Sequence, residues 1–234
     1  MSEQPVKLTA PAAAERVFPD GAAAATERSL ICEHRLTVIL DGAPFAELVC
    51  TRSRLRQLVL GRLCTAGKIS SAADVVALKF SADETRAEVH LRPGAAGRGT
   101  KRLTDGSIWR SADIFTMART LRAAMPLHDE TLGTHGSLLL HRGKVCCCCE
   151  DIGRRSAIDK AVGEALEKGL PPGECLLYTT GRVSAEIVEK VAAAGVKVLV
   201  TRALPTAEAV TLAKALGMTL IGRAWEEQYE VYAP

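Results

Sequence analysis

The residues most able to do chemistry in this sequence are four consecutive cysteines, Cys146–Cys149, which stand just before an acidic pair and two arginines. Successive side chains of a strand point to opposite faces, so Cys146 and Cys148 are expected on one face and Cys147 and Cys149 on the other. Burial of small apolar side chains explains most of such a run. Cys149 is the exception, because a positive environment at the following helix would lower its pKa and favour thiolate or persulfide chemistry.

Metal binding is a second chemistry open to these cysteines. Mononuclear zinc sites generally use two spaced cysteine pairs, which the sequence lacks, but two cysteines of the run with His135 or His141 could form a soft-metal site. Cys146 and Cys148 are the weak candidates for such ligands. His135 could also be a general base or a cofactor contact, although a lone histidine beside glycines is more often a loop residue that makes a backbone hydrogen bond.

Three loops carry groups that suit an anion. They read EDIGRR (150–155), TTGRVS (179–184) and ALPT (203–206), and each follows an expected strand. Loops after parallel strands lie together beyond the carboxyl ends of the sheet, and each here delivers a helix N-terminus with partial positive charge. We therefore expect one site for an anionic, phosphorylated ligand. The candidate contacts in these loops are Asp151, Arg154, Thr180, Gly181, Arg182, Ser184 and Thr206.

A structural role for the same arginines is the alternative. Each could pair with a nearby carboxylate such as Asp151, Asp159 or Glu186, although binding is favoured for the set as a whole. Gly181 fits a turn whose backbone approaches a phosphate, where a Cβ has little room.

Alternation of strands and helices in the second half of the chain predicts the scaffold for these loops. A helix at 113–125 precedes a strand pair near 137–149, followed by helices at 156–168, 184–194 and 206–216 and strands at 174–180, 196–202 and 218–223. Ser156, Ser184 and Thr206 are the expected helix caps, and Gly195 and Gly217 the stops. This order predicts right-handed crossovers and a largely parallel sheet with helices on its faces.

The first half of the chain predicts a smaller unit. Residues 1–27 are rich in Ala and Pro without a sustained period, which indicates a mobile arm. Asp41-Gly42 predicts a hairpin, Ser53 and Gly67 bound a helix, and strands follow at 75–80 and 86–92. The stretch 93–111 is a loop or linker. We thus expect an arm (1–27), a small α+β domain with its loop (28–111) and an α/β cofactor-binding domain (112–234).

Composition narrows the function classes. The 234 residues are 47% hydrophobic, and 30 Lys+Arg against 27 Asp+Glu leave a net charge of only +3. With 4% aromatic residues, neither an electrostatic footprint nor stacking platforms for nucleic acid are present. No apolar stretch is long enough to cross a membrane and no signal peptide is evident, so a cytoplasmic protein with free thiols is expected.

The C-terminal half contains a series of motifs in a characteristic order. They are THGS (134–137), EDIGRRSAIDK (150–160), TTGRVSAEIVEK (179–190), AGV (194–196), LPTAEAVTLAK (204–214) and TLIG (219–222). With these motifs the chain resembles the formate dehydrogenase accessory protein (FdhD) family. In the N-terminal half, CTRSRLRQLVLGRLCTAGKI (50–69) is similar to the family's helix after its first hairpin, so the resemblance extends over about residues 35–232.

The resemblance implies a cytoplasmic, commonly dimeric sulfurtransferase with a cytidine-deaminase-like α/β domain. Such a protein binds the guanine-dinucleotide form of the molybdenum cofactor, or a guanine nucleotide. It passes sulfur from a cysteine desulfurase so that a formate dehydrogenase becomes active. Gly222 and Arg223 belong to the segment that would contact this cofactor.

The working loop of the family differs in this chain. The family reads T-S-G-C-G-V-C-G where this sequence has Thr104–Ser111, so Ser107 is aligned with the sulfur-carrying cysteine and Arg110 with the second cysteine. A serine hydroxyl cannot hold a persulfide. Arg155 replaces a histidine of the family, and residues 223–228 differ from its cofactor-contacting segment.

Three hypotheses follow from this difference in the working loop. In the first, the chain is a sulfurtransferase-like accessory factor for a molybdenum or tungsten enzyme, with the sulfur role moved to Cys149 or a neighbour. Alternatively, it is a non-catalytic paralogue that binds or escorts the cofactor. The third hypothesis is a metal- or redox-responsive protein that uses the cysteine run. A deaminase is disfavoured because the P-C-x-x-C signature is absent.

Overall fold

A six-stranded mixed sheet forms the centre of the larger part of the molecule. The computed structural model describes residues 7–103 and 109–234. The strand order is β12-β11-β10-β9-β7-β8. Its strands are β7 (His135–His141), β8 (Lys144–Asp151), β9 (Cys175–Thr179), β10 (Val198–Thr201), β11 (Thr219–Gly222) and β12 (Glu230–Ala233).

The expectation of a largely parallel sheet is only half right. Strands β9, β10 and β11 are parallel, as the alternating helices and strands predict. However, β7 is antiparallel to both β8 and β9, and β12 is antiparallel to β11. The two-residue turn Arg142-Gly143, with φ of 49° and 77°, closes the β7–β8 hairpin, which the sequence predicts only as a strand pair.

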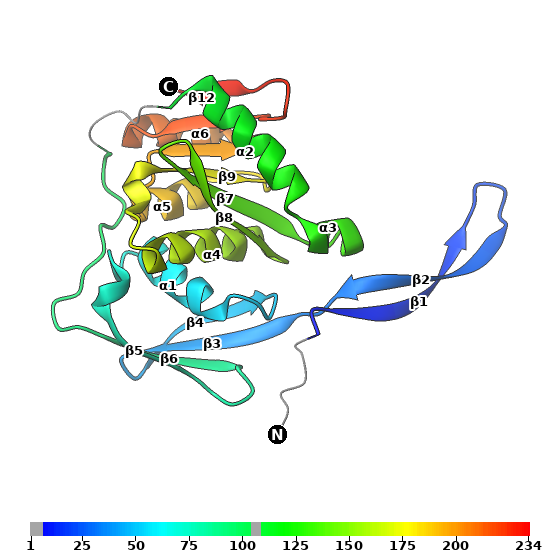
Figure 1. The fold of residues 1–234 in the computed structure, drawn as a ribbon, viewed down its shortest axis with the longest axis horizontal. Helices are drawn as coiled ribbons and strands as arrows, with labels where there is room; N and C mark the ends of the chain where they lie inside the picture. The colour runs from blue at the N-terminus through cyan, green and yellow to red at the C-terminus, as the bar shows by residue number, and fades with distance from the viewer. Residues whose placement is uncertain (1–6, 104–108) are drawn as a thin grey trace.

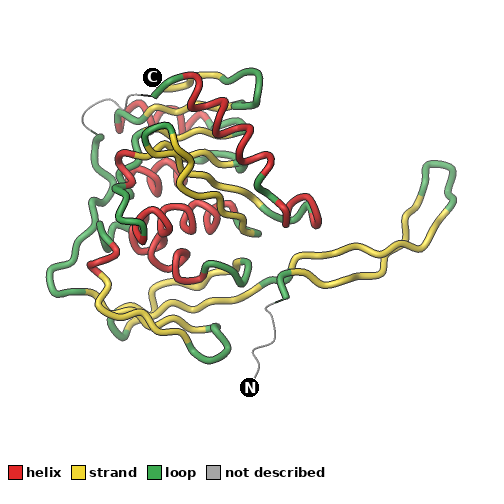
Figure 2. The backbone as a smooth tube through the Cα atoms, viewed as in Figure 1, coloured by secondary structure: helices red, strands yellow, loops and turns green. Residues whose placement is uncertain are grey.

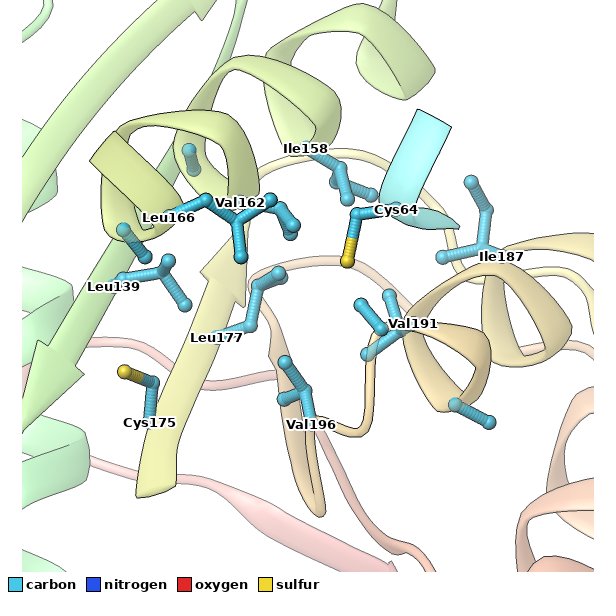
Figure 3. Close-up of a cluster of buried hydrophobic side chains, with 14 of the residues drawn as sticks. Cys64, Leu139, Ile158, Val162, Leu166, Cys175, Leu177, Ile187, Val191 and Val196 are labelled. Atoms are coloured by element: carbon cyan, nitrogen blue, oxygen red, sulfur yellow. The ribbon is translucent and has the colours of Figure 1, made fainter. Parts of the chain in front are cut away.

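Helices cover both faces of this sheet, so the expected α/β class is confirmed (Figure 1). The helices of this part are α2 (Ser111–Ala123), α3 (Pro126–Thr131), α4 (Arg154–Glu167), α5 (Ala185–Ala193) and α6 (Ala207–Leu216). Leu139 and Leu177 pack in the core shared with α4 and α5, whereas Leu138 and Tyr178, their neighbours along the same strands, pack against α2. Figure 3 shows side chains of β7, β9, α4 and α5 meeting in the first of these cores, together with Cys64.

The smaller sheet lies beyond α1 (Leu55–Thr65), and its order is β4-β3-β6-β5. Its strands are β3 (His34–Leu40), β4 (Ala43–Cys50), β5 (Val75–Phe80) and β6 (Arg86–Leu91). The hairpin at Asp41-Gly42 is confirmed. Ser53 does not cap α1: Arg54 is the N-cap residue, with a left-handed φ of 52° and no side-chain cap bond. Gly67 follows the helix with a φ of +68°, as expected of a stop.

Helices α1 and α4 pack directly on each other, and one hydrophobic core joins the small sheet, α1 and the large sheet. The packing is close because glycines stand where the helices cross. A Cβ on Gly163 would collide with the backbone of Gln57, and one on Gly61 with that of Asp159. The boundaries of the expected domains stay a prediction, since the core runs across them.

Residues 9–31 form a long antiparallel hairpin of β1 (Thr9–Val17) and β2 (Ala23–Ile31), where the sequence predicts an arm without regular structure. Figure 2 shows this hairpin projecting from the body. Most of its side chains are exposed on both faces, so it lacks the alternation of apolar and polar residues by which a half-buried strand is recognised.

Of the three predicted N-caps, only one makes a side-chain cap bond. Thr206 caps α6, since its Oγ1 accepts from the backbone N–H of Ala209 at 3.2 Å. Ser184 is the N-cap residue of α5 but makes no cap bond, and Ser156 lies inside α4. The glycines that follow α5 and α6 have φ of +87° and +67°, so both stops are confirmed.

Between β6 and α2, residues 92–103 and 109–110 contain no helix or strand, as the loop prediction requires. Ser107 lies outside the described residues. In the described ranges, none of the helices has the length and apolar character needed to cross a membrane.

Candidate functional site

The three loops of the sequence prediction meet at one edge of the large sheet. Both β8 and β9 are antiparallel to β7, so their carboxyl ends lie together, and β10 is parallel to β9. An isolated bridge between Val183 and Pro205 joins the second loop to the third. The sheet topology thus places the N-terminal ends of α4, α5 and α6 side by side.

A cavity of about 510 Å³ opens beside the first loop and the start of α4. It extends from residues 152–156 across α5 to α1 and to the edge strand β4 of the small sheet. Its polar lining residues are Glu47, Arg62, His135, Arg154, Arg155, Ser156, Asp159, Glu186 and Lys190. Arg62 and Lys190 were not predicted as site residues, because no local motif connects them to the loops.

The basic side chains of this cavity are not equivalent. The Nε atom of Arg155 donates to Glu186 at 2.6 Å, and Lys190 forms an ion pair with Asp159 at 2.8 Å. In contrast, Arg154 forms no direct ion pair within the described part of the chain, although its charge contributes to lowering the pKa of Glu186, and its buried Nε atom lacks a hydrogen-bond partner. The structural alternative therefore holds for Arg155, while Arg154 lines the cavity without a direct ion-pair partner among the described residues.

The starts of α4 and α5 add positive character. Gly153 is the N-cap residue of α4 and has no side chain, and the buried Oγ atom of Ser184 at the start of α5 lacks a partner among the described residues. The first backbone N–H groups of a helix have no partner within the helix, and they attract anions. Two adjacent helix starts without side-chain caps, beside Arg154, form a site suited to a phosphate group.

His135 lies at this cavity in a neutral state near pH 7. Burial, followed by the charge of Arg154, lowers the pKa of its imidazole. Its Nδ1 atom is 3.3 Å from Oγ1 of Thr180, which also accepts from the backbone N–H of Gly136 at 3.1 Å. A neutral imidazole can donate to or accept from a ligand, so the predicted placement of His135 at the site is supported geometrically.

Gly181 is needed for a reason other than the predicted one. A Cβ at this position would lie 2.8 Å from the Cβ of Arg154 and 2.9 Å from its Cδ. The absent side chain therefore makes room for the arginine that faces the cavity.

Asp151 does not face a ligand, contrary to its prediction as a binding residue. Its side chain is completely buried and forms an ion pair with Lys160 at 2.6 Å. It also accepts from the backbone N–H groups of Thr51 at 3.0 Å and Gly153 at 2.9 Å. A charge buried in this way is held by its partners, so Asp151 positions the start of α4.

The remaining predicted contacts do not line the cavity. Arg182 is exposed, and Thr206 uses its hydroxyl to cap α6. Gly222 packs under Pro205, and Arg223 pairs with Glu230 at 3.3 Å.

A small second cavity lies on the α2 face of the sheet, at the end of β9. Thr180 lines it together with Tyr178, Arg202 and Trp225. The guanidinium of Arg202 stands over the ring of Trp225 at 5.3 Å, and Trp225 is 47% exposed. An exposed aromatic residue offers a surface on which a planar base can stack. Trp225 lies in the segment 223–228, which is aligned with the family's cofactor-contacting segment, but it was not predicted as a site residue.

Cys149 is not part of the anion site. Its Sγ atom points towards α4, 3.8 Å from Oε2 of Glu164, and its side chain is buried. A hydrogen bond with Cys147, followed by burial, raises the pKa of the Cys149 thiol. The expected low pKa is therefore wrong, because the neighbouring groups are a second sulfur and a carboxylate.

The predicted alternation along the cysteine run is broken by a β-bulge. Leu139 pairs with Cys147 but Leu140 pairs with Val145, so Cys146 is the extra residue. Cys148 consequently packs on the α2 side, while Cys146 joins the core on the α4 side. The weak metal candidates Cys146 and Cys148 thus do not share a face.

Of the two residues aligned with the cysteines of the family loop, only Arg110 is described. It is exposed and pairs with Asp113 at 2.9 Å, at the start of α2. Its guanidinium is therefore already compensated and does not extend the anion site.

The fold and the site define an α/β protein with a cavity, lined by Arg154 and His135, at the carboxyl ends of its strands. The chain belongs to the FdhD/NarQ family, whose model matches residues 31–108 and 98–234. It is 27% identical over 242 residues to the sulfur carrier protein FdhD of Staphylococcus haemolyticus (strain JCSC1435), covering 92% of each chain. A sulfur carrier protein FdhD of Geobacillus kaustophilus (strain HTA426) is 27% identical over 232 residues, covering 88% of each.

A solved structure shares this fold. It is a crystal structure from Desulfotalea psychrophila, provisionally assigned as a formate dehydrogenase accessory protein. The TM-score is 0.85 at 24% sequence identity, covering 97% of this chain and 98% of the other.

Proposed function

We infer that this protein is a sulfur carrier that serves the maturation of a formate dehydrogenase-type enzyme, and that it holds a nucleotide-bearing molybdenum cofactor at the cavity beside α4. Family membership supports the role. The observation that supports the cofactor site is Arg154, whose buried Nε atom lacks a hydrogen-bond partner among the described residues, beside two helix starts without side-chain caps.

The residues fit the diphosphate of a guanine-dinucleotide cofactor. Arg154 and the backbone N–H groups at the starts of α4 and α5 would hold the phosphates, and neutral His135 would hydrogen-bond to the ligand. Trp225, with Arg202 over its ring, offers a stacking surface for the base on the other side of Thr180. The bound cofactor supplies the metal centre that receives sulfur.

Sulfur loading would occur on the cysteine run. A thiolate of this chain attacks the terminal sulfur of the desulfurase persulfide, the sulfur–sulfur bond of the donor breaks, and the donor cysteine leaves as a thiolate. Cys149 is the predicted acceptor, and half-buried Cys148 is a neighbour with better access to solvent. The proposal further places the protein in the cytoplasm as a homodimer, with a cysteine desulfurase and a molybdoenzyme or tungsten enzyme as partners.

A non-catalytic binding module is the second candidate function. The burial and raised pKa of Cys149 favour it, because a buried thiol is a poor nucleophile. The presence of Ser107 at the aligned sulfur position favours it as well. Such a protein would bind and escort the cofactor without carrying sulfur.

Intact-mass spectrometry after anaerobic incubation with a cysteine desulfurase and cysteine separates the two candidates. A sulfur carrier gains the mass of one sulfur atom, and peptide mapping locates it within Cys146–Cys149. Replacement of Cys149 by Ala abolishes the label if this residue is the acceptor. Unlabelled protein that still binds guanine nucleotide is a binding module.

Calorimetric titration with guanosine diphosphate tests the anion site. Arg154→Ala removes a charged hydrogen-bond partner worth about 1.5–3 kcal/mol, so affinity should fall by about 10- to 150-fold. The matched control is Arg56→Ala, which removes an exposed arginine of α1 that pairs with Glu167 of α4, and it should leave affinity unchanged. Equal affinities of the two variants would exclude the cavity as the nucleotide site.

A further inference from the structure

Two thiols and a carboxylate converge on the inner face of the edge strand β8. Reactive atoms of Cys147, Cys149 and Glu164 all lie within 4.8 Å of one another. The two thiols stand two residues apart on the strand, after the β-bulge, and Glu164 reaches them from the last turns of α4. Neither thiol is used by the anion site at the other end of that helix.

The spacing of these atoms suits tetrahedral coordination. The Sγ atom of Cys149 is 3.8 Å from Oε2 of Glu164. In a tetrahedral zinc site, with Zn–S bonds of about 2.3 Å and Zn–O bonds of about 2.0 Å, ligand atoms lie about 3.5–3.8 Å apart. Small side-chain rotations would bring all three atoms to this separation.

We propose that Cys147, Cys149 and Glu164 form a zinc site that fastens β8 to α4. Two thiolates and a carboxylate are a soft to borderline donor set, which zinc accepts. The fourth position is open to water or to an added soft ligand. This site shares Cys149 with the proposed sulfur-carrier function, but the inference does not rest on that function.

The charges around the site agree with a divalent cation. Binding replaces the two thiol protons by Zn²⁺, so the net charge of the buried site does not change. The carboxylate of Glu164 already pairs with Arg54 and with Lys168, the latter at 2.8 Å. These two cations would offset the single negative charge of a zinc centre with two thiolates and one carboxylate.

A disulfide between the two cysteines is geometrically less suitable. Residues two apart on one strand have Cα atoms about 6.6 Å apart, at the upper end of the range of about 4.4–6.8 Å for disulfides. A metal ion placed between the sulfur atoms needs no such approach of the backbone.

The test is zinc stoichiometry of the full-length protein, reduced anaerobically, loaded with Zn²⁺ and desalted. We expect one equivalent per chain by elemental mass spectrometry, and less than about one tenth of an equivalent in Cys147→Ser and in Cys149→Ser. The Cys146→Ser/Cys148→Ser double variant is the matched cysteine control and should retain the full equivalent.

Co²⁺ loading provides a second readout that does not depend on stability. Thiolate-to-cobalt charge-transfer absorption should appear in the wild-type protein and disappear in both single variants. Glu164→Gln should release zinc to a chelator faster than wild type, whereas Glu167→Gln, one turn further along α4, should not. Absence of retained zinc, its loss in the double variant, or isolation of the protein with a Cys147–Cys149 disulfide would overturn the proposal. The zinc and cobalt experiments do not measure sulfur transfer. A failure of the proposed sulfur-carrier function would therefore appear only in the desulfurase assay.

Discussion

Replacement of Gly163 by Ala sets two physical effects against each other. In the interior of α4, alanine is the better helix former by about 1 kcal/mol, which predicts a more stable protein. However, a Cβ at this position would lie 2.9 Å from the Cα of Gln57 on α1, and nearer still to its carbonyl group. Backbone cannot rotate away as a side chain can, so α1 and α4 must separate.

The expected loss of stability follows from the distance by which α1 and α4 must separate to relieve the clash. Non-bonded heavy atoms prefer about 3.5–4.0 Å, so the helices have to move apart by more than about 1 Å. Overpacking of this kind costs about 1–3 kcal/mol or more, and the separation also loosens the core between the helices. Because the clash is with backbone, we take the upper end of this cost, about 3 kcal/mol, from which the helix-propensity gain of about 1 kcal/mol is subtracted. The net destabilisation of about 2 kcal/mol should lower the Tm of a chain of this size by about 4–8 °C.

Thermal unfolding followed by circular dichroism measures this change. Gly153→Ala is the control on the same helix, because its Cβ would meet only ordinary contacts, 3.5 Å from Ser156 Oγ and 3.6 Å from Asp151 Oδ1. It should cost less than about 1 kcal/mol. A Tm of Gly163→Ala equal to or above that of the wild type would refute the close packing of α1 on α4.

Three further predictions concern the protein interior and the candidate site. Lys160→Met leaves the carboxylate of Asp151 buried without its ion-pair partner, so urea unfolding should show a loss of about 3–5 kcal/mol. Burial lowers the folded-state pKa of His135 below the unfolded value of about 6.5, so its contribution to stability is present above that pH and is lost as the pH falls towards the folded pKa. His135→Gln should therefore make the decline in unfolding free energy between about pH 7 and pH 5 shallower. Burial raises the thiol pKa values of Cys50 and Cys64 to about 12, so iodoacetamide should label both only after unfolding, as peptide mass spectrometry will show.

Elements with strong local signals were predicted well. Asp41-Gly42 favours a two-residue hairpin turn whatever the rest of the chain does, and Gly217 ends α6 because its φ of +67° suits glycine. The capping hydroxyl of Thr206 acts within four residues of its own position. Such features depend on neighbours in the sequence, so tertiary structure does not alter them.

Features that depend on long-range packing were missed. Arg62 reaches the cavity because α1 packs on α4, and Lys190 because α5 places it against Asp159 of α4. Nothing near either residue in the sequence indicates this packing. The bulge at Cys146 has the same origin, since one extra residue in β8 changes which face each earlier side chain occupies. The direction of the pKa shift of the Cys149 thiol could not be predicted without knowing which groups lie on its side of the sheet.

The proposed cofactor site and the proposed zinc site lie at opposite ends of helix α4. Its first residue, Arg154, lines the large cavity, whereas Glu164 lies near the thiols of Cys147 and Cys149, ten residues further along. Ten residues of α-helix span about 15 Å, which is too far for direct sulfur transfer from Cys149 to a group held at Arg154. Cofactor binding and cysteine chemistry should therefore respond independently to substitutions at the two ends of this helix. A sulfur carrier that uses Cys149 would have to release β8 from α4 before it could deliver its sulfur.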